Sequence, residues 1–228
     1  FDHLIMFFVG LEILSVAMYV LTGSDKRNLR SNEAALKYFL MGSFATGILL
    51  FGITLVYGAT RSFYLTNIAL NIANTPPEST PVFLSIGLLL ILVGFLFKIS
   101  AAPFHFWTPD VYEGAPTIFT MFMSTVVKAA SFAAIYQLLS GPFGTMYSTW
   151  VYPMYYVSMI TLLVGNITAV YQQSLKRMLA YSSISHAGYM LLTVMSKQES
   201  TQSTILYYSL SYTLATLVAF GVVMIVAE

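Results

Sequence analysis

Residues 81–107 read PVFLSIGLLLILVGFLFKISAAPFHFW, an apolar run that is interrupted first by Lys98 and then by Pro103. A helix that crosses a membrane needs about 20 mostly apolar residues, and the segment Thr80–Ala101 supplies them. The run is too long and too continuous for the ~10-residue alternating strands of a membrane barrel. It therefore predicts a transmembrane helix that carries a lysine close to its end and is broken near Pro103.

Six further stretches have the same apolar character, so the sequence predicts an all-α polytopic membrane protein with about seven transmembrane helices. We expect residues 1–228 to form a single transmembrane domain, and the loop over 59–79 to be irregular because it holds prolines and asparagines. The seven predicted spans are His3–Thr22, Glu33–Gly58, Thr80–Ala101, Thr117–Ser140, Trp150–Tyr171, Met178–Ser196 and Ser203–Glu228.

The composition agrees with a membrane protein and excludes several other classes. Hydrophobic residues make up 57% of the chain and charged residues 8%, against about 25% charged residues in a typical soluble domain. A net charge of +1 offers no basic surface for nucleic acid. The absence of cysteine excludes disulfides, thiolate zinc sites and cysteine-bound iron–sulfur clusters.

Basic residues in the short loops predict the orientation, because loops on the cytoplasmic side carry the excess of lysine and arginine. The first and fifth loops hold Lys26, Arg27, Arg30, Lys176 and Arg177, whereas the second and sixth hold only Arg61 and Lys197. We expect the first, third and fifth loops to lie on the cytoplasmic side.

Ionisable side chains inside predicted spans are the candidate functional residues. A charged residue at the centre of a membrane helix costs about 2.5–3.5 kcal/mol on insertion scales, so such residues usually mark an ion or proton path. Lys128 lies about 16 Å deep at 1.5 Å per residue, too deep for its ammonium to reach the surface. The candidates are Glu12, Lys37, Lys98, Lys128 and His186.

Structural alternatives exist for each of these residues. Lys37 and Lys98 lie close enough to a helix end to extend their ammonium groups to the surface. Lys128 has the alternative of a buried ion pair with Glu12. His186 shares a helix face with serines and tyrosines. It could therefore be a packing residue that is held by hydrogen bonds, and no metal-ligand spacing accompanies it.

The predicted break near Pro103 is the second functional signal. A proline lacks the N–H that would continue the helix and so frees a backbone carbonyl, and a lysine before the break with His105 after it suggests a proton-handling device. A simple helix end is the alternative. We interpret the following segment, residues 107–116, as a short loop in which Asp110 and Glu113 form a solvated cap.

Four motifs in the chain point to one family. The central motif is FKISAAPFHFWTPDVYEGAP over residues 97–116, and the second is KRMLAYSSISHAGY over residues 176–189. Two shorter matches are GLEILS over residues 10–15 and NEAALKY over residues 32–38. These motifs resemble the antiporter-like membrane subunits of NADH–quinone oxidoreductase (respiratory complex I), and within that family the subunit N (subunit 2) branch. The resemblance extends over essentially the whole chain.

The resemblance implies a fourteen-helix fold with two inverted repeats, of which this chain would supply helices five to eleven. It also implies that Glu12 pairs with Lys98 on the broken helix, that Lys128 carries protons onward toward the centre of the membrane, and that His105 lies beside the break. A further lysine or glutamate of the exit half would follow Glu228.

The resemblance further implies a translocase subunit that carries no redox chemistry and binds no cofactor or metal itself. NADH, FMN, iron–sulfur clusters and quinone would belong to partner subunits. The expected partners are neighbouring antiporter-like and small helical membrane subunits and the lipid bilayer, and the expected location is the bacterial inner (plasma) membrane. A mitochondrial inner or thylakoid membrane is the alternative location.

A sodium/proton antiporter of the Mrp type or a membrane-hydrogenase subunit is the alternative function. A seven-helix receptor is a third reading, but it explains the buried charges less well.

Overall fold

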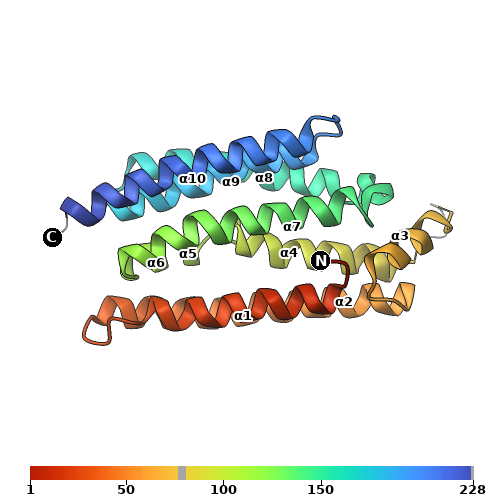
Figure 1. Cartoon of the computed structure of the whole chain (residues 1–228), viewed down its shortest axis with the longest axis horizontal. Helices are drawn as coiled ribbons and strands as arrows, with labels where there is room; N and C mark the ends of the chain where they lie inside the picture. Colours follow the sequence, from red (N-terminus) through yellow and green to blue (C-terminus); the bar gives the residue numbers. More distant parts are fainter. Residues whose placement is uncertain (77–80, 227–228) are drawn as a thin grey trace.

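The computed structural model describes residues 1–76 and 81–226, and its helices run side by side along one long axis (Figure 1). The predicted start of the third span at Thr80 and the predicted end of the last span at Glu228 lie outside these described residues. Within them the fold is helical, and the only β pairing there is an isolated bridge between His3 and Tyr64.

The long helices are α1 (Leu4–Thr22), α2 (Leu29–Thr60), α4 (Val82–Lys98), α7 (Lys128–Ser140), α8 (Tyr147–Val170), α9 (Leu175–Met195) and α10 (Thr201–Val226). The short elements are α3 (Leu65–Ala73), α5 (Trp107–Gly114), α6 (Thr117–Phe122), a π-helix (Met123–Val127) and a 3-10 turn (Gly144–Met146). Each long helix begins and ends within a few residues of a predicted span, except that the structure divides the span Thr117–Ser140 among α6, a π-helix and α7.

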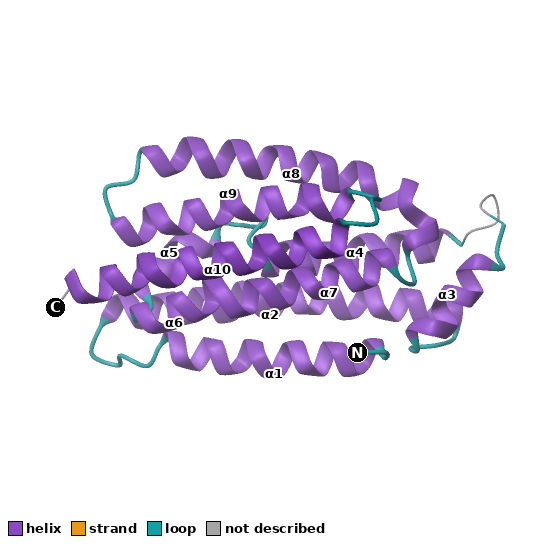
Figure 2. Ribbon diagram, turned by 45° about the horizontal axis from the view of Figure 1, so that its top comes forward, coloured by secondary structure: helices purple, strands orange, loops and turns teal. Residues whose placement is uncertain are grey.

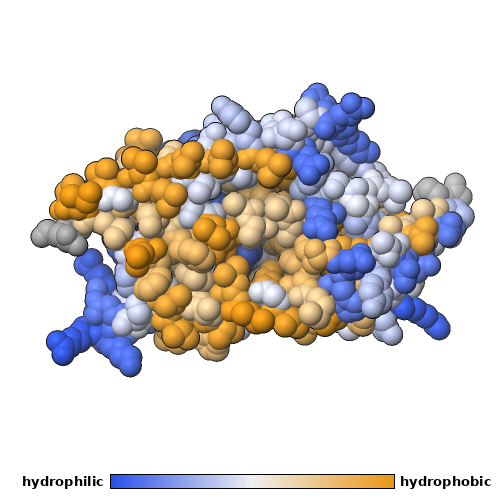
Figure 3. All heavy atoms as spheres, viewed as in Figure 1, coloured by the Kyte–Doolittle hydropathy of each residue, from blue (hydrophilic) through white to orange (hydrophobic). Residues whose placement is uncertain are grey.

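Within residues 1–76 and 81–226, five helical segments are long and apolar enough to cross a membrane: α1, α2, α10, the continuous run Thr117–Ser140, and Gly144–Val170. Helix α4 is apolar but has only 17 residues. Hydrophobic atoms cover the middle of the molecular face shown in Figure 3, and hydrophilic atoms gather toward its two ends. The all-α polytopic membrane architecture is confirmed, whereas the number of seven spans stays a prediction.

Two closely packed helix pairs form the two sides of the bundle. Helix α2 packs along α4, and α8 packs along α9. Gly52 of α2 and Gly87 of α4 face each other so closely that a Cβ atom on Gly52 would lie 2.7 Å from the Gly87 carbonyl oxygen. Small residues that let backbones approach in this way are typical of membrane helix contacts. The continuous helix α6–α7 lies between the two sides and contacts α1, α4, α9 and α10.

The helix break predicted near Pro103 is present between α4 and α5. Side chains hydrogen-bond to backbone groups at the break, because unpaired backbone N–H and C=O groups are costly inside a membrane. The N–H of Ala102 donates to Thr161 Oγ1 of α8 at 2.9 Å, and Trp107 Nε1 donates to the Phe97 carbonyl at 3.0 Å. The break is thus a bonded structural element, and it holds α5 against the end of α4.

Two segments predicted as loops are helices, so that part of the prediction was wrong. In α3, Leu65, Ile68 and Ile72 share one buried face, a helical spacing that the asparagines of this segment obscured. In α5, Pro109 occupies the first turn, where a missing N–H costs no helical hydrogen bond.

The first, third and fifth loops lie at one end of the bundle, as alternating spans require, and the side of the membrane that this end faces stays a prediction. The turn between α1 and α2, the junction of α5 with α6, and the loop between α8 and α9 are at the left in Figure 2. The N-terminus and α3 lie toward the opposite end.

Candidate functional site

Lys98, the last residue of α4, is 6% exposed and reaches α1. Its Nζ donates to Ser15 Oγ at 2.7 Å, and Ser15 Oγ donates in turn to the Leu11 carbonyl at 2.6 Å. The ammonium also lies 5.8 Å from the ring centre of Tyr38. A groove of about 470 Å³ between α1, α4 and α7 includes Lys98 in its wall.

The expected ion pair between Glu12 and Lys98 is not formed among the described residues. Glu12 Oε1 is buried and has no hydrogen-bond partner there. Ser15, which holds the lysine, follows Glu12 by three residues, so the two side chains lie on one face of α1 about one turn apart. The hydroxyl of Ser15 thus occupies the contact that the resemblance assigned to the carboxylate, and the carboxylate lies unpaired close by.

Lys128 lies in the middle of the bundle and is 1% exposed. The π-helix Met123–Val127 immediately precedes it, and single π-turns of this kind often occur at functional sites. Its Nζ donates to the Ser183 carbonyl at 2.7 Å and to Ser183 Oγ at 2.5 Å. The alternative of an ion pair with Glu12 is not what the structure shows, because these two acceptors of α9 hold the ammonium.

His186 lies one turn along α9 from Ser183 and contacts two tyrosines of α10. Its Nδ1 is 2.8 Å from the Tyr208 hydroxyl, and its ring centre is 4.9 Å from that of Tyr212. Tyr212 donates a hydrogen bond to Ser183 Oγ at 2.8 Å. His186 is therefore linked through α10 to the serine that holds Lys128.

His105 lies in the bonded break between α4 and α5. It is 8% exposed, and its Nδ1 has no hydrogen-bond partner among the described residues. Its ring lies 4.7 Å from that of Phe106. An unpaired buried nitrogen of this kind is a position at which an internal water commonly binds.

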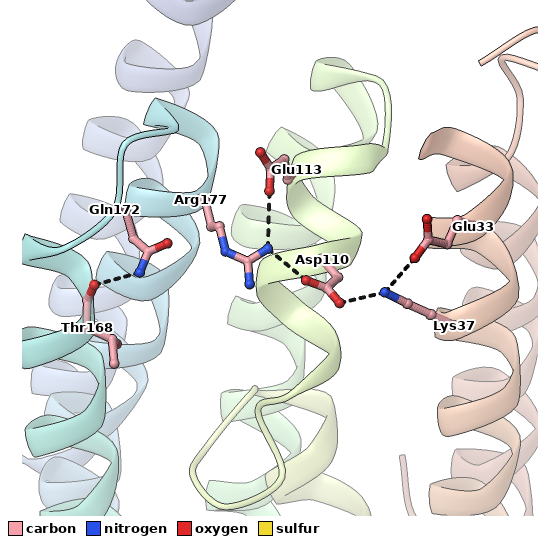
Figure 4. A network of polar contacts seen from close by, with 7 residues as sticks. All are labelled: Glu33, Lys37, Asp110, Glu113, Thr168, Gln172 and Arg177. Carbon is pink, nitrogen blue, oxygen red and sulfur yellow. Dashed lines mark hydrogen bonds and ion pairs between the residues drawn. The ribbon is translucent and has the colours of Figure 1, made fainter. Parts of the chain in front are cut away.

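Lys37 belongs to an ion-pair network at the charged end of the bundle (Figure 4). Its Nζ lies 2.7 Å from Glu33 and 2.8 Å from Asp110. Arg177 of α9 lies 2.7 Å from Asp110 and 3.2 Å from Glu113. Asp110 therefore bridges a cation of α2 and a cation of α9.

The interpretation of Asp110 and Glu113 as a solvated cap was wrong, because both carboxylates are paired and tie α5 to its neighbours. Sequence reasoning did not select Arg177 for this site. The sequence did contain a signal for this contact. The predicted orientation placed the segment with Asp110 and Glu113 on the same side of the membrane as the loop before Arg177. Gln172, also drawn in Figure 4, follows the end of α8 and donates from Nε2 to the carbonyl oxygen of Thr168 in that helix at 2.9 Å.

Sequence reasoning also missed Ser15 and Ser183, which bond to the buried lysines, and Tyr212, which bonds to Ser183. Each is a small or amphipathic polar residue within an apolar span, which hydropathy alone does not distinguish from a packing residue. Within residues 1–76 and 81–226, no group of three or more His, Asp or Glu side chains could hold a metal ion.

A family model described as "NADH:quinone oxidoreductase/Mrp antiporter, TM" matches residues 2–228. NADH-quinone oxidoreductase subunit N of Trichlorobacter lovleyi is 48% identical over 225 residues, which are 99% of this chain and 46% of that protein. The chain spans about half the length of the curated relatives it matches.

Solved structures show the same fold. A chain of respiratory complex I from Thermus thermophilus with bound aureothin is 40% identical, with a TM-score of 0.75 over 94% of this chain and 46% of that chain. A chain of the Mrp complex from a Dietzia species is 22% identical, with a TM-score of 0.84 over 96% of this chain and 40% of that chain, and it shows likeness of fold alone. The family predicted from the motifs is confirmed: the chain belongs to the NADH:quinone oxidoreductase/Mrp antiporter transmembrane family.

Proposed function

We propose that this chain is part of the proton-translocating subunit N of an NADH–quinone oxidoreductase in the bacterial inner membrane. The observation that carries the proposal is the pair of buried lysines, Lys98 and Lys128, in a chain 48% identical to a relative named NADH-quinone oxidoreductase subunit N. Burying two lysines inside a membrane protein costs free energy, and such residues usually have a role in transport. In this proposal residues 1–228 act as a single transmembrane module.

Proton transfer starts at the contact between α1 and α4. A nearby carboxylate stabilises the ammonium form of a lysine, and burial without one favours the neutral amine. Movement of Lys98 between Ser15 and Glu12 therefore changes how tightly this lysine holds its proton. Moving one charge across 100 mV costs about 2.3 kcal/mol, a cost that forming or losing a buried ion pair can offset.

Lys128 is the next carrier, and His105 and His186 are the imidazoles that exchange protons with this line. Lys37 acts at the charged end of the bundle, where Asp110 and Glu33 hold its ammonium. The driving signal comes from partner subunits, which supply NADH oxidation on FMN and iron–sulfur clusters and quinone reduction. This chain itself binds no cofactor and carries out no redox step.

The test is to purify the native membrane complex that contains this chain and to reconstitute it in liposomes. The proposal expects NADH-driven quinone reduction with acidification of the liposome interior, and co-purifying flavin and iron–sulfur subunits. Cation/proton exchange without NADH oxidation would contradict it and would favour the Mrp-type antiporter, whose fold this chain shares.

A further inference from the structure

We propose that Ser183 and Tyr212 position Lys128 and pass its proton into a small polar cavity between α9 and α10. The inference deepens the proposed function and rests on it, because it presupposes that Lys128 carries protons. In this inference Ser183 and Tyr212 link the buried lysine to His186. Neither of these two residues is ionised at neutral pH.

The hydrogen bonds of Ser183 carry the first step of the argument. Its Oγ accepts from Lys128 Nζ at 2.5 Å and from the Tyr212 hydroxyl at 2.8 Å. A serine hydroxyl has two acceptor lone pairs and one O–H donor. Both lone pairs are thus occupied, which leaves the O–H as a donor, and the Tyr112 hydroxyl of α5 also lies within hydrogen-bond reach of Ser183.

The cavity carries the second step. It has a volume of about 140 Å³, and Ser183, His186, Tyr212 and Thr216 supply its polar walls. A polar cavity of this size holds several waters, since each needs only ~15 Å³ and two to four polar partners. Because Ser183 lines this cavity, a water in it is an acceptor for the Ser183 O–H in addition to the Tyr112 hydroxyl.

These two features define a balanced proton transfer. Lys128 Nζ gives one proton to Ser183 Oγ as the Ser183 hydroxyl gives its own proton to a cavity water. Lys128 becomes a neutral amine, Ser183 is unchanged, and the water becomes hydronium, which His186 then neutralises by becoming imidazolium. Tyr212 keeps Oγ in place and its own ring against His186, 4.9 Å away.

Because Lys128 is buried, its proton has few other acceptors within reach. Its second acceptor is the backbone carbonyl of Ser183 at 2.7 Å, which can hold the ammonium but cannot relay a proton. Of the two acceptors of this lysine, only the hydroxyl both accepts and donates.

The test uses the full-length subunit in the intact complex, reconstituted in liposomes, with NADH-driven proton uptake as the readout. Ser183→Ala is expected to lower the initial rate of uptake about fivefold, because it removes a hydrogen bond to a charged group and the relay oxygen. Ser183→Thr keeps a hydroxyl and is expected to restore at least half of the rate. Oxidation of NADH by a hydrophilic acceptor reports that each complex is assembled.

Ser185→Ala is the matched control, because Ser185 is a buried serine of the same helix whose Oγ bonds to Asn166 instead, at 3.0 Å. It is expected to leave uptake unchanged. Tyr212→Phe is expected to lower uptake about twofold, whereas Tyr207→Phe, at a tyrosine of the same helix that is 74% exposed, has no effect.

Two outcomes would overturn the inference: normal uptake in Ser183→Ala, or an equal loss in Ser183→Ala and Ser183→Thr. If Lys128→Ala lowers uptake while Ser183→Ala does not, only this inference fails. If Lys128→Ala also leaves uptake normal, the proposed function fails with it.

Discussion

Lys98 of α4 bonds to Ser15 of α1 at 2.7 Å, one helical turn from the unpaired carboxylate of Glu12. One oxygen of this carboxylate, Oε1, is buried, and a carboxylate near a buried ammonium stabilises the charged form of the lysine even without direct contact. The proposed function therefore expects a shift of α1 relative to α4 to change the protonation of Lys98.

Glu12→Gln tests this arrangement by removing the charge while keeping the shape. We expect NADH-driven proton uptake to fall about tenfold, because the variant has no carboxylate to stabilise protonated Lys98. Glu12→Asp retains the charge on a shorter side chain and should keep part of the activity. Uptake at the normal rate in Glu12→Gln would show that Glu12 takes no part in the transfer.

Asp110→Asn tests the network at the charged end. The substitution weakens the bridge between Lys37 and Arg177, although each cation keeps one carboxylate, Glu33 or Glu113. Because the Asp110 side chain is 35% exposed, solvent screens the interaction, and we expect a loss of only about 1 kcal/mol in stability.

Thermal unfolding of the purified complex measures that loss as a fall of a few degrees in the Tm of this subunit. Glu199→Gln is the control, since Glu199 is an exposed carboxylate in the loop between α9 and α10. An equal fall in both variants would argue against a bridging role for Asp110.

Gly52→Ala tests the packing of α2 on α4. A Cβ atom there would lie 2.7 Å from the Gly87 carbonyl oxygen and 2.8 Å from the Ile91 nitrogen, and backbone atoms cannot move aside cheaply. We expect a destabilisation of about 2 kcal/mol, measured as reduced assembly and a lower Tm.

Gly47→Ala provides the matched control on the same helix, because its Cβ would meet nothing within 4 Å. Alanine favours a helix over glycine by about 1 kcal/mol, so this variant should be neutral or slightly stabilising. A loss of stability as large as that of Gly52→Ala would contradict the packing account.

The sequence predicted the long helices well, because each apolar run is set by the thickness of the bilayer. The helix Thr117–Ser140 was predicted with the bounds that the structure shows, although the π-turn inside it leaves no mark in the apolar pattern. The short helices α3 and α5 were missed because asparagine and proline are common in loops as well as in first turns.

For the candidate site, the buried charges were predictable and their partners were not. A lysine inside an apolar run is conspicuous, which is how Lys98 and Lys128 were found. Whether Lys98 contacts Glu12 or Ser15, one turn apart on the same face, depends on side-chain rotamers and on the exact approach of α1 to α4. Ser183 was likewise identified only once the packing of α7 against α9 was known.

The most direct test of the central claim is the rate of NADH-driven proton uptake by the reconstituted complex carrying Lys128→Ala. The matched control is Lys197→Ala, which removes a lysine that lies on the ring of Tyr147, 3.7 Å from its centre. The account predicts that Lys128→Ala lowers uptake at least about tenfold while the complex stays assembled, and that Lys197→Ala pumps normally. Normal uptake in an assembled Lys128→Ala complex would contradict the claim that protons pass through this lysine.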